Sequence, residues 1–384
     1  MPYYWPAIGG VEVVCQCISE ELVKRGHQVD VFTCKRTHKG TPVLSMANHE
    51  TINGVNVHRF KGYVNIGHYS LFPGFIPELY KGAFDIIHTH GYRQPQSEIG
   101  SIIGASFNIP TILHVHGGFY TDSKSKRFFY DLYDQFARDH KVNRFDHFIT
   151  LSEADRDRML ALNADKKNVS IIRNAAEDSA FTKIDPSAFK RKYDLENKKI
   201  ILYLGILNPF KRPDLVIRAL PFLREKVPEV FALFVGPDAG ELKRINEIAE
   251  ALDVTESYKW VGPLRGREKH EALEAAEFLV LPSDEDPYPL VLLEAMAHGK
   301  PVLTTNVVGQ ASIIAANEAG IVVAPGDTKA IEEGAHLLLT DETFRRTTGS
   351  NALKLAERAF SVASVVDEIE GLYARLIENK RNQV

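Results

Sequence analysis

Two carboxylates and a proline-rich turn stand close together in the segment PSDEDPYPLVLLEAMAHGKPV, residues 282–302. Asp286 lies in an expected loop, and Glu294 follows eight residues later in an expected helix that begins near Pro289. The junction of a strand end and a helix start presents free backbone N–H groups and the positive end of the helix dipole. The segment therefore predicts an anion site suited to phosphate. The alternative is that both carboxylates are merely solvated.

Four histidines alternate along two apolar runs nearer the amino terminus: His88, His90, His114 and His116. Alternate side chains of a strand point to one face, and imidazoles suit zinc. A closed zinc site needs four ligands in fixed geometry, which two strand pairs do not establish. We therefore predict no metal site, and we expect His114 to be a packing or hydrogen-bonding neighbour.

The elements that must position these residues alternate between short apolar runs and helix-length amphipathic segments. Apolar side chains at 11, 14, 15, 18 and 22 share one helical face, and a strand is expected at 28–34. Further strands are expected at 55–60, 84–90, 110–116, 147–152 and 169–174, and then at 199–207, 230–236, 258–262, 277–283 and 301–305. Repeated strand–helix–strand units predict an α/β protein with parallel, doubly wound sheets.

A polar stretch at 185–197 separates two such domains. We expect an amino-terminal domain over 1–185 and a carboxyl-terminal domain over 195–360, with a last helix at about 361–384 that packs back on the first domain.

The second domain opens with a strand, whereas the first opens with the loop PYYWPAIGG and a helix at 11–25. A doubly wound domain begins with a strand before its glycine turn. We therefore expect the first strand to be missing from the sequence as given.

Composition excludes several classes of protein. The 384 residues carry 46 Lys and Arg against 50 Asp and Glu, and this balance argues against a nucleic-acid binder. No apolar run reaches the 18 residues of a membrane span, and the first residues lack the pattern of a signal peptide. The three cysteines (Cys15, Cys17 and Cys34) form no C-x-x-C motif, which favours a reduced, cytoplasmic setting.

The segment at 282–302 resembles a signature of the retaining glycosyltransferases of family 4, the "glycosyl transferases group 1" type with the GT-B fold. The signature reads P-S-x-x-E-x7-E-A-M-A-x-G-x-P-V, and the matching residues are Pro282, Ser283, Asp286, Glu294, Ala295, Met296, Ala297, Gly299, Pro301 and Val302. Upstream, Gly205 and Lys211 match the strand–Gly–loop–Lys stretch of the family. Gly9–Gly10 and the sequence HVHG at 114–117 also fall in order, so the resemblance covers nearly the whole chain.

This resemblance implies two Rossmann-like domains that face a central cleft. It implies transfer of a sugar, with retained anomeric configuration, from a nucleotide-diphosphate-sugar donor to a hydroxyl of a glycan, lipid-linked or small-molecule acceptor. The nucleotide would bind the second domain and the acceptor the first. The implied catalytic residues are His116 and Asp286 near the donor sugar and Lys211 at the diphosphate. The implied donor-binding residues are Gly10, Gly205, Lys211, Arg212, Tyr288, Pro289, Leu290, Val291 and Glu294, with Glu294 at the ribose.

The sequence departs from the family pattern at several positions. Ile206 stands where the family usually has Arg, Asp286 replaces Glu, and Ser312 stands where a Gly-Gly-x-x-Glu motif would end in its acid. Two alternatives therefore remain beside the transferase: a nonhydrolysing sugar-nucleotide epimerase, and a catalytically weakened nucleotide-sugar-binding protein. A dinucleotide oxidoreductase is disfavoured because no G-x-G-x-x-G opens either half.

The expected partners are thus a nucleotide-sugar donor and a glycan or lipid-linked acceptor, with no cofactor, no metal and no nucleic acid. Basic and aromatic residues mix at 124–130, in the sequence KSKRFFY. The plainer interpretation of this segment is a solvated helix start. The alternative is weak contact with a membrane surface or an anionic lipid, which would make a cytoplasmic protein peripheral at the inner membrane face.

Overall fold

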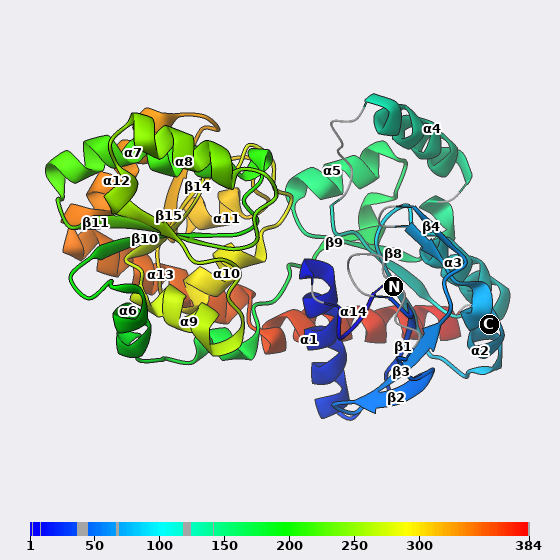
Figure 1. Ribbon diagram of the computed structural model, residues 1–384. Helices are drawn as coiled ribbons and strands as arrows, with labels where there is room; N and C mark the ends of the chain where they lie inside the picture. Colours follow the sequence, from blue (N-terminus) through cyan, green and yellow to red (C-terminus); the bar gives the residue numbers. More distant parts are fainter. Residues whose placement is uncertain are drawn as a thin grey trace. The chain divides into compact units, whose positions relative to one another are not determined.

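The computed structural model describes residues 1–382 apart from 2, 8, 37–44, 67–68, 118–123 and 141. The chain forms two compact units, which are described separately below (Figure 1). Unit 1 comprises Met1–Ala175 and Val362–Val384, and unit 2 comprises Ala176–Ser361. The polar stretch at 185–197, expected to lie between domains, is inside unit 2, where Ser187–Tyr193 form the helix α6. The stretch is polar because α6 is a short helix at the surface, in which only Phe189 is buried.

Unit 2 contains one six-stranded parallel sheet. Its strands are β10 (Lys199–Leu204), β11 (Val230–Val235), β12 (Tyr258–Trp260), β13 (Phe278–Leu281), β14 (Val302–Thr305) and β15 (Gly320–Val323). The order is β12-β11-β10-β13-β14-β15, so the chain starts at the centre, fills one side and then the other. This is the 3-2-1-4-5-6 order of a Rossmann-like, doubly wound sheet.

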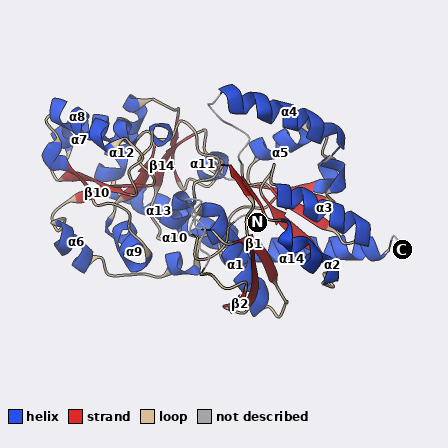
Figure 2. Cartoon of the chain, turned by 45° about the vertical axis from the view of Figure 1, so that its right-hand side comes forward, coloured by secondary structure: helices blue, strands red, loops and turns tan. Residues whose placement is uncertain are grey.

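Helices cover both faces of this sheet, as Figures 1 and 2 show. They are α6 and then α7 (Pro213–Lys226), α8 (Leu242–Ala251), α9 (Gly266–Ala275), α10 (Leu290–Ala297), α11 (Ala311–Ala316), α12 (Thr328–Thr340) and α13 (Glu342–Ala359). One layer contains α7, α8 and α12, and the other contains α6, α9, α10 and α13. Because both faces are covered, every side chain of β11 is buried, and its sequence VFALFV is a continuous apolar run.

Unit 1 carries two main groups of strands. One sheet has the order β1-β3-β2 and the other has the order β6-β7-β8-β9, and a small hairpin pairs β4 with β5. The strands are β1 (Asp30–Cys34), β2 (His49–Ile52), β3 (Val55–Phe60), β4 (Val64–Ile66), β5 (Tyr69–Leu71), β6 (Ile87–His90), β7 (Thr111–His114), β8 (His147–Thr150) and β9 (Val169–Ile171). The pairs β1–β3, β6–β7, β7–β8 and β8–β9 are all parallel.

The helices of unit 1 include the last helix of the chain. They are α1 (Gly10–Lys24), α2 (Ile76–Lys81), α3 (Pro95–Phe107), α4 (Lys124–His140), α5 (Glu153–Ala161) and α14 (Val362–Arg381). Helix α14 packs along α1, where Arg25 Nη1 lies 2.6 Å from Asp367 and 2.8 Å from Glu370. No strand precedes α1 in the described residues of the first ten.

Candidate active site

The strand order of unit 2 reverses between β10 and β13, which pair through Ile201–Phe278 and Leu202–Leu279. Ligands of open α/β sheets bind beyond the carboxyl ends of the strands at such a point. Two loops meet there, residues 205–212 after β10 and 282–289 after β13. The Asp284 N–H donates to the carbonyl of Phe210 at 2.7 Å, so the loops are joined through their backbones. The structure thus brings the predicted residues Lys211 and Asp286 to one sheet edge.

Lys211 is positioned by a short 3-10 turn over Pro209–Lys211. The side chain of Asn208 caps this turn, because its Oδ1 accepts from the Lys211 N–H at 2.9 Å. The ammonium of Lys211 then lies 2.8 Å from Asp286 Oδ2, and the two side chains are only 20% and 12% exposed. The Lys211 side chain lies against Gly205, where an added Cβ would be 3.5 Å from Lys211 Cδ. A partly buried cation therefore stands at the predicted anion site.

Arg212, the next residue, is held by acidic neighbours. Its Nε and Nη2 donate to the two oxygens of Asp214 at 3.0 and 3.2 Å, and its Nη1 donates to Asp284 at 2.9 Å. Asp214 is 1% exposed, and hydrogen bonds and charge from Arg212 keep its pKa low despite its burial. The guanidinium thus fixes one loop to the other, and any contact with a diphosphate would use its two remaining N–H groups.

Helix α10 begins at Leu290, one residue after the start predicted at Pro289, which is the N-cap. The carbonyl of Pro289 accepts from the Leu292 N–H at 3.2 Å and from Gln310 Nε2 at 3.0 Å. Leu290 and Val291 precede the first intrahelical bond, so their N–H groups are the free donors of this helix start. Tyr288 packs beside them and is 8% exposed. These are the backbone groups that the sequence predicted for an anion.

Glu294 lies one turn further along α10 and is almost fully buried. Its Oε1 accepts from Lys269 Nζ at 3.1 Å, and its Oε2 has no hydrogen-bond partner in the described structure. Burial raises the pKa of Glu294. Lys269 also reaches Glu177 at 3.5 Å, and these two carboxylates raise its pKa in spite of the opposing effect of burial. No sequence pattern indicated Lys269, which is 25 residues from Glu294.

Two further buried oxygens near the start of α10 have no hydrogen-bond partner in the described structure, Ser283 Oγ and Gln310 Oε1. Both residues are 0% exposed. Buried polar atoms in native proteins almost always have a partner, supplied by the protein, by water or by a ligand. Together with Glu294 Oε2, these two atoms make three buried acceptor oxygens on and around α10. Gln310 was not predicted, although it is a lone amide ahead of an apolar run.

The four histidines singled out by the sequence, His88, His90, His114 and His116, stack face to face on β6, on β7 and just after β7. Ring centroids are 4.4 Å apart for His88 and His90 and 4.1 Å apart for His114 and His116. His90 Nδ1 and His116 Nε2 are hydrogen-bonded at 3.0 Å. Burial lowers the pKa of His116 to about 3, so this ring is neutral at physiological pH. His116 Nδ1 is buried and has no hydrogen-bond partner among the described residues.

The stacked rings do not resemble a closed metal site. Candidate ligand atoms of His88, His90 and His114 lie within 4.8 Å of one another, as do those of Cys15, His90 and His116. Histidines on zinc aim their nitrogens at one centre about 2.0–2.1 Å away. Here neighbouring rings meet face to face, with interplanar angles near 20°. His114 is fully buried and packs between its neighbours.

The remaining predicted residue, Gly10, is the first residue of α1, and Gly9 is its N-cap with φ −158°. Gly10 and His116 belong to unit 1, whereas the other predicted residues belong to unit 2. Six of these lie in the joined loops, namely Gly205, Lys211, Arg212, Asp286, Tyr288 and Pro289. The other three, Leu290, Val291 and Glu294, follow in α10.

Comparison with known proteins shows the family and the fold of the chain. Residues 8–179 match the family model described as Glycosyltransferase Family 4, and residues 186–355 match the model described as Glycosyl transferases group 1. An uncharacterized glycosyltransferase of Methanocaldococcus jannaschii is 26% identical over 97% of this chain and 95% of its own length. The D-inositol 3-phosphate glycosyltransferase of Stackebrandtia nassauensis is 25% identical over 97% of this chain and 88% of its own length.

Among solved structures, Anabaena Alr3699/HepE in complex with UDP superposes with a TM-score of 0.76 at 19% identity, over 96% of each chain. This likeness shows the fold, two Rossmann-like domains of GT-B type. With the two family models covering consecutive halves of the sequence, the chain belongs to the group 1 glycosyltransferases of GT-B fold.

Proposed function

We propose that this glycosyltransferase takes its sugar from a nucleoside-diphosphate sugar and passes it to an acceptor hydroxyl with retained anomeric configuration. The observation that carries the proposal is the pairing of a partly buried cation, Lys211, with a helix start whose neighbouring oxygens lack partners. UDP-sugars are the first donors to test, because the Anabaena structure holds UDP. The epimerase alternative is not favoured, since the relatives named above are glycosyltransferases.

The diphosphate is proposed to lie between Lys211 and the free N–H groups of Leu290 and Val291. In the free protein the ammonium of Lys211 is neutralised by Asp286 at 2.8 Å. A bound diphosphate would pair with the ammonium of Lys211 in place of Asp286. Fixed positive groups at the leaving diphosphate stabilise the negative charge that develops on it in the transition state. Asp286 would then face the positive charge that grows on the sugar.

The hydroxyl groups of the ribose are proposed to donate hydrogen bonds to the carboxylate of Glu294. One oxygen of Glu294 is held by Lys269 at 3.1 Å, so the carboxylate is fixed in direction, and the other oxygen is free to accept. A buried carboxylate that accepts hydrogen bonds from ribose hydroxyls also discriminates against nucleosides that lack these hydroxyls. The reason is that a buried acceptor left without a hydrogen bond costs binding free energy.

His116 is proposed to contact a hydroxyl of the donor sugar. Because its pKa is about 3, the ring acts as a neutral hydrogen-bonding group and not as a proton donor.

We also propose that no metal ion takes part at the diphosphate. The proposal rests on Lys211 and the N–H groups of Leu290 and Val291 as the positive groups at the diphosphate.

A glycan or lipid-linked acceptor belongs to the same proposal. The described part of the chain contains no helix long and apolar enough to cross a membrane. Helix α4 exposes Phe128 and Phe129, each 66% accessible, beside Arg127. Lys124 and Lys126 of the predicted basic-aromatic segment lie outside the described side chains. Such a surface supports weak, peripheral membrane contact at the cytoplasmic face, and the three free cysteines fit a reducing compartment.

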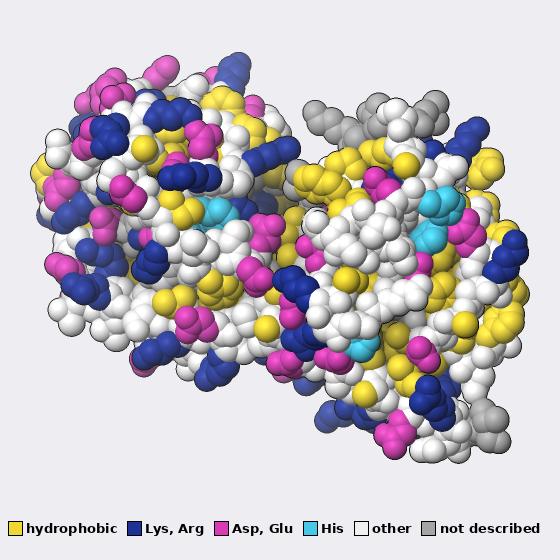
Figure 3. Space-filling view, turned by 90° about the horizontal axis from the view of Figure 1, so that it is seen from below, with side chains coloured by type: hydrophobic (Ala, Val, Ile, Leu, Met, Phe, Trp, Pro, Cys, Tyr) yellow, Lys and Arg dark blue, Asp and Glu magenta, His cyan; other side chains and the backbone are white. Residues whose placement is uncertain are grey.

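A nucleic-acid substrate is not part of this proposal. On the face drawn in Figure 3, basic and acidic side chains are interspersed, in keeping with 46 basic against 50 acidic residues. A nucleic-acid groove would gather one sign of charge.

The test is incubation with UDP-, GDP- and ADP-sugars and a panel of acceptors, with release of free nucleotide and the product anomer followed by NMR. We expect one donor class to be consumed with retention, and His116→Ala to reduce turnover at least tenfold at nearly unchanged nucleotide affinity. A sugar isomer formed without acceptor would instead indicate an epimerase. Binding without any turnover would indicate a nucleotide-sugar-binding protein.

A further inference from the structure

Two histidines and a glutamate converge at the β2 side of the three-stranded sheet of unit 1. His49 on β2 and His58 on β3 stand directly opposite each other in the antiparallel pair, and their Nδ1 atoms lie 2.9 Å apart. Glu78 reaches the same place from α2, with its Oε2 3.1 Å from His58 Nδ1. Three different elements therefore bring three potential metal ligands together, with one atom of each within 4.8 Å of the others.

The spacing of these atoms suits a zinc ion. Ligands that bind zinc tetrahedrally, at about 2.0–2.1 Å from the ion, lie about 3.3 Å from one another. The two separations at His58 Nδ1, 2.9 and 3.1 Å, are close to this value. The rings of His49 and His58 are nearly perpendicular, at 82°, so their nitrogens can point to one centre. The face-to-face rings of His88 and His90 cannot do so.

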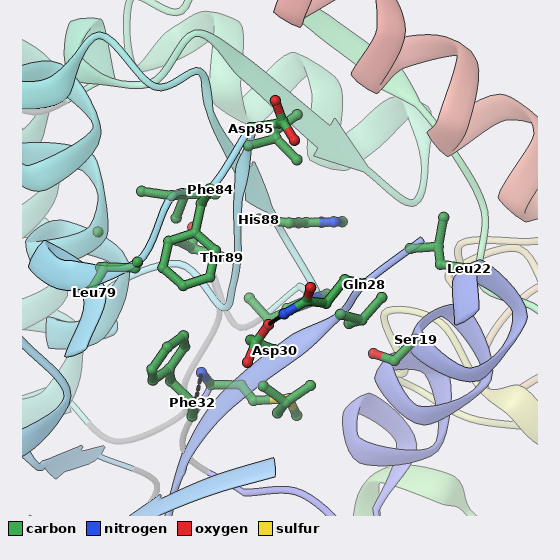
Figure 4. Close-up of a pocket in the computed structure, with 18 of the residues that line it drawn as sticks. Ser19, Leu22, Gln28, Asp30, Phe32, Leu79, Phe84, Asp85, His88 and Thr89 are labelled. Carbon is green, nitrogen blue, oxygen red and sulfur yellow. Dashed lines mark hydrogen bonds between the residues drawn. The ribbon is translucent and has the colours of Figure 1, made fainter. Parts of the chain in front are cut away.

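The ring of His58 is held in one orientation by β1. Its Nε2 is hydrogen-bonded to Asp30 Oδ1 at 2.7 Å, and its ring stacks on Phe32 with the centroids 4.9 Å apart. Figure 4 shows Asp30 and Phe32 on this strand. Histidines that bind metals commonly donate their other ring N–H to a carboxylate, which leaves the first nitrogen with a lone pair for the ion. Asp30 provides that carboxylate for His58.

A cation resolves a conflict among these side chains. When His58 Nε2–H donates to Asp30, the Nδ1 lone pair of the ring faces the Glu78 oxygen at 3.1 Å and the ring nitrogen of His49 at 2.9 Å. A single proton has to be shared among these three atoms. A metal ion binds all three at once, and the close approach of a second imidazole therefore favours the metal over the proton.

We propose that His49, His58 and Glu78 form a binding site for a divalent transition-metal ion, and that zinc is the ion that fits best. Two imidazole ligands disfavour Mg²⁺ and Ca²⁺, which prefer oxygen. The side chain of His49 is 56% exposed, so an ion can reach the site from solvent. A hollow of about 350 Å³ is lined in part by His49 and Glu78, and the fourth position of the zinc is open to water on that side.

A bound ion would join α2 to the β2–β3 hairpin and stabilise the folded form of unit 1. No sequence pattern indicated this site, because His49 and His58 are nine residues apart and are brought together only by the pairing of the two strands. The proposal is independent of the proposed function, since none of its residues is assigned to the donor or the acceptor.

The experiment titrates Zn²⁺ into the metal-free 384-residue chain, with the affinity measured by competition with a chromophoric chelator. His49→Ala and Glu78→Gln should each weaken zinc binding about tenfold or more, and Asp30→Asn should do so by about 10- to 100-fold through the orientation of the ring. His27→Ala is the matched control, because His27 is an exposed histidine paired with a carboxylate, that of Glu370, at 2.7 Å. Its zinc affinity should equal that of the unchanged chain.

Two further measurements accompany the titration. Zinc should raise the melting temperature of the unchanged chain more than that of His49→Ala, whereas the metal-free forms of both should melt alike. Co²⁺ bound in place of zinc should give the visible bands of a tetrahedral site, and Glu78→Gln should weaken them. Equal zinc affinity in all the variants would overturn the proposal, because the ion would then bind elsewhere. A chain that binds no zinc would also overturn it, and a proton would then hold the three side chains together.

Discussion

Replacing Lys211 by alanine removes the cation that we place at the diphosphate. Its ammonium lies 2.8 Å from Asp286 Oδ2, and its side chain is 20% exposed. A hydrogen bond to a charged group contributes about 1.5–3 kcal/mol, which corresponds to roughly 10- to 150-fold in affinity. Lys211→Ala should therefore weaken nucleoside-diphosphate binding by that factor. The nucleoside alone should bind almost as before.

The substitution also leaves Asp286 without its counter-ion, so a stability effect has to be separated from a binding effect. An unpaired, largely buried partner costs about 1–3 kcal/mol of unfolding free energy. The double variant Lys211→Ala with Asp286→Ala removes both charges and should regain most of that loss without regaining diphosphate affinity. Lys192→Ala is the matched control, because Lys192 forms an exposed ion pair with Glu268 elsewhere in unit 2.

Isothermal titration of each variant with uridine and with UDP measures these differences, and thermal unfolding measures the stability. The reasoning is refuted if Lys211→Ala binds UDP as tightly as the unchanged protein. It is equally refuted if uridine and UDP lose affinity by the same factor, since Lys211 would then act on the nucleoside or on the fold.

Four further outcomes are expected. Asp286→Asn should leave UDP affinity equal or slightly higher, because Lys211 is released, while turnover of the UDP-sugar falls; a fall in UDP affinity would contradict this. Glu294→Gln should weaken uridine and UDP alike in calorimetry, by about tenfold or more. Burial lowers the pKa of His88 from 6.5 to about 3, so the folded state binds fewer protons and loses stability as the pH falls from about 6.5 towards 3. In His88→Gln, urea unfolding at several pH values should show that slope reduced by up to about 1.4 kcal/mol per pH unit. Gly236→Ala should lower the melting temperature and UDP affinity together, because an added Cβ would lie 1.9 Å from the Gly205 carbonyl oxygen and displace the loop that carries Lys211.

The periodicity of the sequence was sufficient to predict the strands and helices that carry the site. The strand predicted at 199–207 is β10, over Lys199–Leu204, and the helix predicted to begin near Pro289 is α10, over Leu290–Ala297. Continuous apolar runs identify strands buried on both faces, and the parallel order follows from the alternation with helices. The meeting of Lys211 and Asp286 was predictable in outline, because both follow strands whose carboxyl ends share one edge.

Contacts between residues without a shared pattern could not be predicted in this way. Lys269 reaches Glu294 from α9, and Gln310 reaches Pro289 from the loop before α11. These pairings depend on how helices pack on the sheet, which the period of a sequence does not specify. The stacking of the histidines likewise depends on the register of β6 and β7, in which His90 pairs with His114.

The most direct test of the central claim is hydrogen exchange of the whole chain with and without UDP at saturating concentration. The account predicts slower exchange of the backbone amides over 205–212 and 283–292, with Leu290 and Val291 among them, since a diphosphate would accept from the free N–H groups at the start of α10. It predicts that Lys211→Ala reduces this protection at equal UDP concentration. Protection confined to other segments, or unchanged by Lys211→Ala, would contradict the placement of the donor diphosphate at this loop and helix start.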